Sequence, residues 1–149
     1  MVTKNNKLKT TDNIIPIDIP YVSIVMPVHN CGAYIKEAID SMLHQTMSDF
    51  EFIIVNDGST DDSGIIVHSY ADPRIRVIDF AENKGCYPAR NCGMQLARGK
   101  YICVMDADDI SLPKRLELQC DFLEKNRDIG LVGSAFRYMN DTDSVYRNT

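Results

Sequence analysis

Residues 101–110 read YICVMDADDI, an apolar run that ends in three carboxylates within four residues. The apolar part is typical of a buried strand, and the acidic part follows where that strand should reach the surface. Burying an isolated carboxylate is costly, so such a cluster is either a solvated loop or a cation site. Mg²⁺ takes oxygen ligands and is usually bound by one or two carboxylates together with substrate phosphates. The stretch alone leaves both interpretations open.

Length and composition narrow the class of protein. A chain of 149 residues, 44% of them hydrophobic, is long enough for one domain or part of one. The net charge of -5 disfavours nucleic acid as the main partner. No apolar run approaches the roughly 18 residues that span a bilayer, and the polar start lacks the apolar core of a secretory signal. Five scattered cysteines without a Cys-x-x-Cys pair indicate reduced thiols. We therefore expect a cytoplasmic protein.

Strand and helix patterns alternate along the chain. Apolar runs predict strands at residues 21–26, 50–55, 75–80, 101–105 and 130–138, with the first strand ended by Pro27 and helices in the connections. This spacing predicts an α/β fold with a mostly parallel sheet and helices on both faces. Residues 1–20 read as a leader, separate from a domain at 21–149.

Two serines are predicted to start helices. Ser59, followed three residues later by Asp62, is typical of a capping box and predicts a helix to about residue 70. Ser111 is predicted to cap a helix that runs to about residue 125. The pair Lys114 and Arg115 in its first turn is interpreted as part of a solvated face.

Polar turns follow the first, second and fourth predicted strands, at residues 27–30, 57–59 and 106–109. In a parallel sheet these turns lie at one edge, and ligands of such folds bind outside the carboxyl ends of the strands. We therefore expect the three turns to form one site.

The ordered set of motifs resembles the N-terminal, nucleotide-sugar-binding part of family 2 glycosyltransferases. The matching stretches are residues 22–30, 54–61, 83–85, 89–91, 97–102, 106–110 and 113–116. The resemblance covers about residues 21–138 and implies a Rossmann-like GT-A fold that is C-terminally truncated in this chain.

The same resemblance implies a reaction. A sugar would pass from a nucleotide-diphosphate sugar, most often a UDP-sugar, to a hydroxyl of a saccharide or lipid-linked acceptor, with Mg²⁺ or Mn²⁺ and with inversion. Family members often build polysaccharide at the inner face of the membrane. The carboxylate base is expected beyond Thr149, so the chain is expected to bind donor and transfer poorly alone. The alternative is a non-catalytic donor-binding module that needs a missing acceptor domain or partner. A sheet edge exposed by truncation could also support a homodimer.

Family motifs also imply roles for individual residues. The implied donor-binding residues are Pro27, His29, Asn30, Asp57, Lys84, Arg90 and Asp106. Asp57 would contact base and ribose, a role that suits a carboxylate acceptor at a strand end. Asp108 would bind the metal ion together with Asp106. His29 is expected to flank the pocket without a catalytic role.

Rival classes fit the sequence less well. A dinucleotide-binding oxidoreductase needs Gly-x-Gly-x-x-Gly after its first strand, which residues 27–32 do not contain. A phosphoacceptor receiver domain should have acidic residues after that strand, where this chain has Pro-Val-His-Asn. A phosphohydrolase with an Asp-x-Asp nucleophile would carry it after the first strand instead of the fourth.

Overall fold

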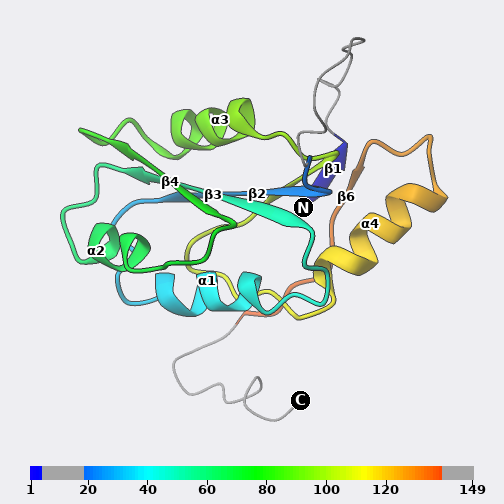
Figure 1. The fold of residues 1–149 in the computed structure, drawn as a ribbon, viewed down its shortest axis with the longest axis horizontal. Coiled ribbons are helices and arrows are strands. Elements are labelled where there is room, and N and C mark those ends of the chain that lie inside the picture. The colour runs from blue at the N-terminus through cyan, green and yellow to red at the C-terminus, as the bar shows by residue number, and fades with distance from the viewer. Residues whose placement is uncertain (5–18, 139–149) are drawn as a thin grey trace.

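A six-stranded sheet with helices on both faces organises the chain (Figure 1). The structure is a computed structural model and describes residues 1–4 and 19–138. Its elements are β1 (Val2–Lys4), β2 (Val22–Val28), α1 (Ile35–Leu43), β3 (Phe50–Asp57), α2 (Ser63–His68), β4 (Ile75–Phe80), α3 (Cys86–Leu96), β5 (Tyr101–Val104), α4 (Arg115–Lys125) and β6 (Leu131–Val132). Within these residues no helix combines the length and the apolarity needed to cross a bilayer.

The strands are arranged in the order β4-β3-β2-β5-β1-β6. Strands β4, β3, β2 and β5 are parallel, whereas β1 is antiparallel to both β5 and β6. Every residue of β2 and β3 is buried, as expected for parallel strands covered on both faces. The predicted α/β fold with a mostly parallel sheet is confirmed.

Alternate residues of the central strands pack on opposite faces. Ile24 and Met26 join the larger core with α1, α2 and α4, while Val25 joins a smaller core beneath α3. Helix α3 packs very closely, because a Cβ on Gly93 would lie 2.4 Å from a methyl group of Val25. Figure 1 shows α3 alone on its side of the sheet. The predicted helices on both faces are thereby confirmed.

Several strand ends differ from the prediction, those of β2 and β6 among them. Strand β2 continues through Pro27 to Val28, because its pairing with β5 ends at Val25 and the missing N–H of Pro27 breaks no bond on that side. The predicted strand at 130–138 is only the two-residue β6. It pairs with β1 through Val2 and Thr3, and the Lys4 N–H donates to the Gly130 carbonyl just before it.

The first residues of the chain contribute a strand that the sequence did not reveal. Val2 is fully buried and pairs with Cys103 of β5. Residues 2–4 thus lie inside the sheet between β5 and β6. Residues 5–18, the rest of the predicted leader, lie outside the described residues, and the boundary at residue 20 stays a prediction.

Neither predicted serine caps its helix. Helix α2 begins at Ser63, and the carboxylate of Asp61 accepts a hydrogen bond of 3.0 Å from the Ser63 N–H. The Ser59 hydroxyl instead accepts from the Asn30 N–H of another loop. Helix α4 begins at Arg115, and Ser111 Oγ lies 2.7 Å from the Arg115 guanidinium. The Ser59 hydroxyl thus bonds to a loop 29 residues away, and the Ser111 hydroxyl bonds to the side chain of the first residue of α4.

Candidate functional site

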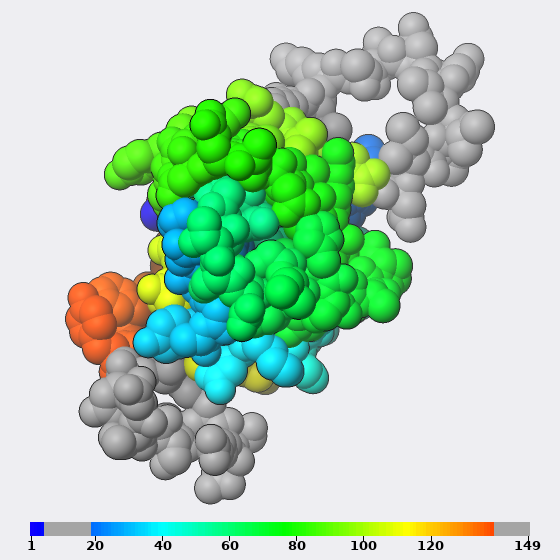
Figure 2. All heavy atoms as spheres, turned by 90° about the vertical axis from the view of Figure 1, so that its left-hand side faces the viewer, coloured from blue at the N-terminus to red at the C-terminus, as the bar shows by residue number. Residues whose placement is uncertain are grey.

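Loops from four parallel strands meet at one edge of the sheet. They are residues 29–34 after β2, 58–62 after β3, 81–85 after β4 and 105–114 after β5. Figure 2 looks onto this edge, where the light-blue, teal and green segments around residues 30, 60 and 85 lie together. The sequence predicted convergence of the first, second and fourth loops, and the loop after β4 joins them.

Asp57, at the end of β3, holds the loop after β4. Its side chain is almost completely buried, at 1% exposure. One carboxylate oxygen accepts from the Lys84 N–H at 2.7 Å and the other from the Gly85 N–H at 2.8 Å. Gly85 has φ of +94°, a conformation that favours glycine. Asp57 lies where the sequence predicted, and its two oxygens are used to organise the neighbouring loop.

Gly58 brings the second and third loops into backbone contact. It has φ of +61°, and a Cβ there would lie 2.5 Å from the carbonyl carbon of Glu82 and 2.6 Å from the nitrogen of Asn83. Only glycine combines this conformation with so close an approach. The Asp57-Gly58 pair therefore joins the ends of β3 and β4 into one surface.

The β2 loop is joined to the same surface. His29 Nδ1 lies 2.8 Å from the Asp57 carbonyl oxygen, and His29 Nε2 lies 3.3 Å from the Asn30 side-chain nitrogen. Asn30 is exposed and has φ of +51°, and its side-chain oxygen accepts from the Thr60 N–H. Pro27 is buried within β2. The structure brings His29 and Asn30 to the edge and leaves Pro27 beneath it.

The acidic loop after β5 exposes its carboxylates. Asp106, Asp108 and Asp109 are exposed, whereas the intervening Ala107 is buried, at 4% exposure. Burial, and then repulsion from Asp106 and Asp108, raises the pKa of Asp109. Burial raises the pKa of the Cys31 thiol. A hydrogen bond to the His29 carbonyl opposes this rise, and the charges of Asp108 and Asp61 add to it. Negative charge thus accumulates on this loop, beside the loop after β2.

Helix α3 supplies one cation to the acidic loop. Arg90 donates from Nη2 to a carboxylate oxygen of Asp106 at 2.7 Å. Its Nε is buried without a hydrogen-bond partner among the described residues. Lys84, also predicted for the donor site, has Nζ 4.9 Å from the centre of the Phe80 ring. Arg90 therefore reaches the acidic cluster, whereas the Lys84 side chain packs against Phe80 at the end of β4.

Arg115 is a supporting residue that the sequence analysis missed. It was interpreted as part of a solvated face, but its guanidinium donates to the Val104 carbonyl at 2.9 Å and to the Ser111 hydroxyl at 2.7 Å. These bonds bridge the start of the acidic loop to the residues near its end. A lone Arg at a helix start carries no signal for this role, because its partners come from β5 and the loop.

The donor set of the acidic loop fits a hard divalent cation in part. In the described ranges, no group of three or more His, Cys, Asp or Glu side chains is arranged to hold a metal ion. Mg²⁺ and its analogues are often held by one or two carboxylates, with the remaining ligands from phosphate and water. Asp108 is exposed and makes no hydrogen bond or ion pair with the described residues, and Asp106 retains one oxygen outside its bond to Arg90. Two carboxylate groups are therefore available as ligands.

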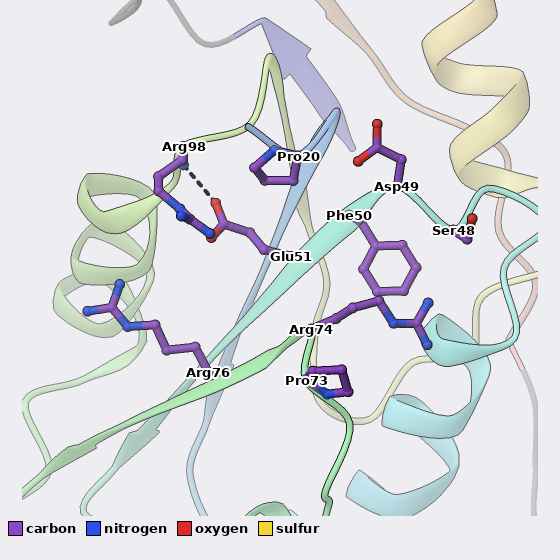
Figure 3. A pocket seen from close by; sticks show the side chains of 9 residues that line it. All are labelled: Pro20, Ser48, Asp49, Phe50, Glu51, Pro73, Arg74, Arg76 and Arg98. Carbon is purple, nitrogen blue, oxygen red and sulfur yellow. Dashed lines mark hydrogen bonds and ion pairs between the residues drawn. The ribbon is translucent and has the colours of Figure 1, made fainter. Parts of the chain in front are cut away.

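A hollow of about 430 Å³ lies at the opposite edge of the sheet, where strands begin. Figure 3 shows the residues that line it, which include Phe50, Arg74 and Arg98. Two of the three arginines that line it are already paired, Arg98 with Glu51 at 2.9 Å and Arg74 with Asp72 at 2.8 Å. The volume of this hollow is weaker evidence for a site than the exposed carboxylates of the acidic loop. The loops at the carboxyl ends of the strands are therefore the stronger candidate site.

Comparison with known proteins agrees with this geometry. The model of glycosyl transferase family 2 matches residues 23–149. The chain belongs to this family. A relative from Methanocaldococcus jannaschii, the uncharacterized glycosyltransferase MJ1057, is 41% identical over 135 residues, which are 88% of this chain and 47% of the relative. The chain thus spans about half the length of that relative.

Solved glycosyltransferase structures share the fold. Staphylococcus aureus TarS 1–349 in complex with UDP-GlcNAc has a TM-score of 0.67 and 27% identity, over 71% of this chain and 32% of that chain. The mannosyltransferase PcManGT of Pyrobaculum calidifontis, in complex with GDP-Man and Mn²⁺, has a TM-score of 0.62 and 25% identity, over 78% and 36%. The GT-A fold predicted for this family 2 chain is confirmed.

Proposed function

We propose that the loops at the carboxyl edge bind a nucleotide-diphosphate sugar and a divalent cation, so that the sugar can pass to an acceptor hydroxyl. The observation that carries the proposal is the position of Asp106 and Asp108, exposed on the loop after β5 at the edge where the other three loops meet. TarS has been solved with UDP-GlcNAc, and PcManGT has been solved with GDP-Man and Mn²⁺. These partners support a nucleotide-sugar donor and Mg²⁺ or Mn²⁺ as the cation.

Each site residue then has a physical role. Asp108, which has no protein partner among the described residues, holds the cation, with the second oxygen of Asp106 as a further ligand. Arg90 orients Asp106 through their ion pair and adds a positive charge near the diphosphate. Asp57 holds the Lys84–Gly85 backbone, which forms one wall of the nucleotide pocket.

The proposed transfer reaction is a displacement at the anomeric carbon of the sugar. The acceptor oxygen bonds to the anomeric carbon from the face opposite the diphosphate, the bond to the leaving phosphate oxygen breaks with its electron pair, and a carboxylate base takes the acceptor proton. A divalent cation at Asp108 supplies Lewis-acid stabilisation of the charge that develops on the leaving diphosphate. The acceptor is proposed to be a saccharide or lipid-linked hydroxyl. The base is proposed to come from an acceptor-binding part, for which the longer relatives have additional sequence.

Titration calorimetry with UDP and with GDP, in the presence and absence of Mn²⁺, tests the proposal. The parent chain is expected to bind one of these nucleotides only with Mn²⁺. Asp108→Asn removes the charge and keeps the size of the side chain, and it is expected to weaken that binding at least about tenfold, or about 1.4 kcal/mol. Asp128→Asn, the same change at an exposed position between α4 and β6, is the control and should bind as the parent does.

Two results would contradict the proposal. Failure of the parent to bind either nucleotide with Mn²⁺ would remove the donor site, and equal affinity of the parent and Asp108→Asn would remove the cation site. Once nucleotide binding is established, a second assay tests whether the chain hydrolyses or transfers the matching nucleotide sugar. Either activity indicates an enzyme, and the absence of both indicates a donor-binding module. Release of free nucleoside diphosphate from that sugar is the measured signal.

A further inference from the structure

We infer that Asn30 and Asp61 are positioning residues that lock the loop after β2 to the loop after β3 before any donor binds. The inference rests on the proposed function, because the locked loops form part of the proposed nucleotide pocket. Family resemblance placed Asn30 among the donor-binding residues and assigned no role to Asp61. The hydrogen bonds give both residues a different task.

The Asn30 side chain reaches from the loop after β2 to the loop after β3 and accepts hydrogen bonds there. Its Oδ1 accepts from the Thr60 N–H at 2.8 Å and from the Asp61 N–H at 3.4 Å. Its backbone N–H donates to Ser59 Oγ at 3.2 Å. The residue adopts φ of +51°, which asparagine tolerates better than most residues with a Cβ. A left-handed turn at this position aims the side chain across the gap between the loops.

Asp61 carries an acceptor in the reverse direction. Its Oδ2 accepts from the Gly32 N–H at 2.9 Å, while its Oδ1 accepts from the Ser63 N–H at the start of α2. Ser63 Oγ in turn accepts from the Cys31 N–H at 2.8 Å. Hydrogen bonds from Ser63 and then Gly32 lower the pKa of Asp61, so this acceptor stays ionised at neutral pH. Each loop thus supplies acceptors to the backbone of the other.

The polar side-chain atoms of Asn30 and Asp61 already have protein neighbours, and for this reason we assign these side chains a positioning role. Asn30 Oδ1 faces the backbone of the second loop, and the Asn30 amide nitrogen lies 3.3 Å from His29 Nε2, so both ends of the amide have protein neighbours. Both carboxylate oxygens of Asp61 face backbone N–H groups. A donor that contacted these atoms would compete with the bonds between the loops.

The loops joined by Asn30 and Asp61 also contact the wall of the proposed nucleotide pocket. The second loop begins at Gly58, whose backbone touches Glu82 and Asn83, and the preceding Asp57 binds the next two N–H groups of that third loop. Releasing the first loop from the second therefore loosens a wall of the proposed pocket. Ordering that wall during binding would lower affinity, because loop ordering opposes association. A preassembled wall avoids this cost.

Asn30→Gly separates the lock from the backbone conformation. Glycine accepts φ of +51° without strain but has no oxygen to offer Thr60 and Asp61. We expect faster amide hydrogen exchange at Thr60 and Asp61 in the free chain, by about tenfold, and a similar weakening of UDP or GDP binding with Mn²⁺. Asn30→Asp keeps an acceptor oxygen and should restore the exchange protection.

Asp61→Ala and the double variant test reciprocity. If both side chains act through the same pair of loops, the loss of nucleotide affinity in Asn30→Gly/Asp61→Ala is smaller than the sum of the two single losses. Asn126→Gly is the matched control, since that asparagine donates to the Phe122 carbonyl at the end of α4, far from the two loops in sequence. It should leave both exchange at the loops and nucleotide binding unchanged.

The readouts distinguish failure of the lock from failure of the proposed function. Unchanged exchange at Thr60 and Asp61 in Asn30→Gly overturns the lock, whether or not a nucleotide binds. Faster exchange with unaltered nucleotide affinity overturns its role in positioning. Absence of nucleotide binding by the parent chain refutes the proposed function and, with it, any role of the lock in donor binding.

Discussion

Replacing Asp57 with asparagine separates two roles that this residue could have. The family resemblance implies recognition of base and ribose, whereas the structure uses both carboxylate oxygens to hold the N–H groups of Lys84 and Gly85. Asparagine has nearly the same shape but offers one acceptor oxygen and turns an NH₂ group toward the second N–H. The loop-holding role therefore predicts a loss of stability, and the recognition role predicts a loss of binding alone.

The structure allows a rough magnitude. The two bonds, of 2.7 Å and 2.8 Å, reach a carboxylate that is 1% exposed, and hydrogen bonds to charged groups contribute about 1.5–3 kcal/mol each. The Asp57→Asn variant is not expected to lose the full sum, because one neutral bond remains and the N–H of Lys84, an exposed residue, can bind water. We expect the free energy of unfolding to fall by about 2 kcal/mol, or about 4–8 °C in Tm.

Urea unfolding followed by far-UV circular dichroism measures this loss, and amide exchange at Lys84 and Gly85 reports the loop directly. Asp128→Asn, at an exposed position, should change stability by less than about 0.5 kcal/mol. Parent-like stability and parent-like exchange in Asp57→Asn, together with weaker nucleotide binding, would refute the loop-holding role. That result would favour direct recognition of the base instead.

Two further predictions concern the opposite end of the strands. Gly99→Ala should cost about 1–3 kcal/mol, since its Cβ would lie 2.5 Å from the backbone nitrogen of Ser23, while Gly130→Ala has open space and should not lower the urea midpoint. Burial would raise the pKa of Glu51, but bonds from Ser23 and Arg98 outweigh it and hold the pKa low. A low folded pKa stabilises the fold above the unfolded value of about 4.3, so the stability gap between the parent and Glu51→Gln should shrink as pH falls below that value. A gap that is constant with pH, or widens in acid, would contradict the assignment.

Helix and strand interiors were predictable because their signals are local. The apolar residues Ile35, Ala38, Ile39 and Met42 recur at helical spacing, and all are buried on α1. Boundaries were less predictable, because distant residues decide them. Ser59 has the sequence of a helix cap, but its hydroxyl accepts from Asn30, and the first N–H of α2 donates to Asp61 instead. Pro27 was expected to end β2, yet it lies beyond the last pair with β5, where its missing N–H has no consequence.

The site was predictable at the level of its loops. Asp57, Asp106 and Asp108 follow strands in the sequence, and parallel pairing brings those strand ends to one edge. The partners of these residues were not predictable. Arg90 reaches Asp106 from α3, and Arg115 supports the acidic loop from α4, through contacts that depend on how the helices pack.

The sequence by itself determined the order of strands and helices from residue 21 onward, the mostly parallel sheet and the family, because hydrophobic period and strand-end motifs are properties of short segments. Only the tertiary structure decided that Val2–Lys4 belongs to the sheet, that Asp57 holds a loop and that Asn30 and Asp61 face each other's backbones. These features join residues about 30 to 100 positions apart, as in the pairs Asn30 with Thr60 and Val2 with Cys103. Such contacts exist only after the core has brought the segments together, so no local pattern encodes them.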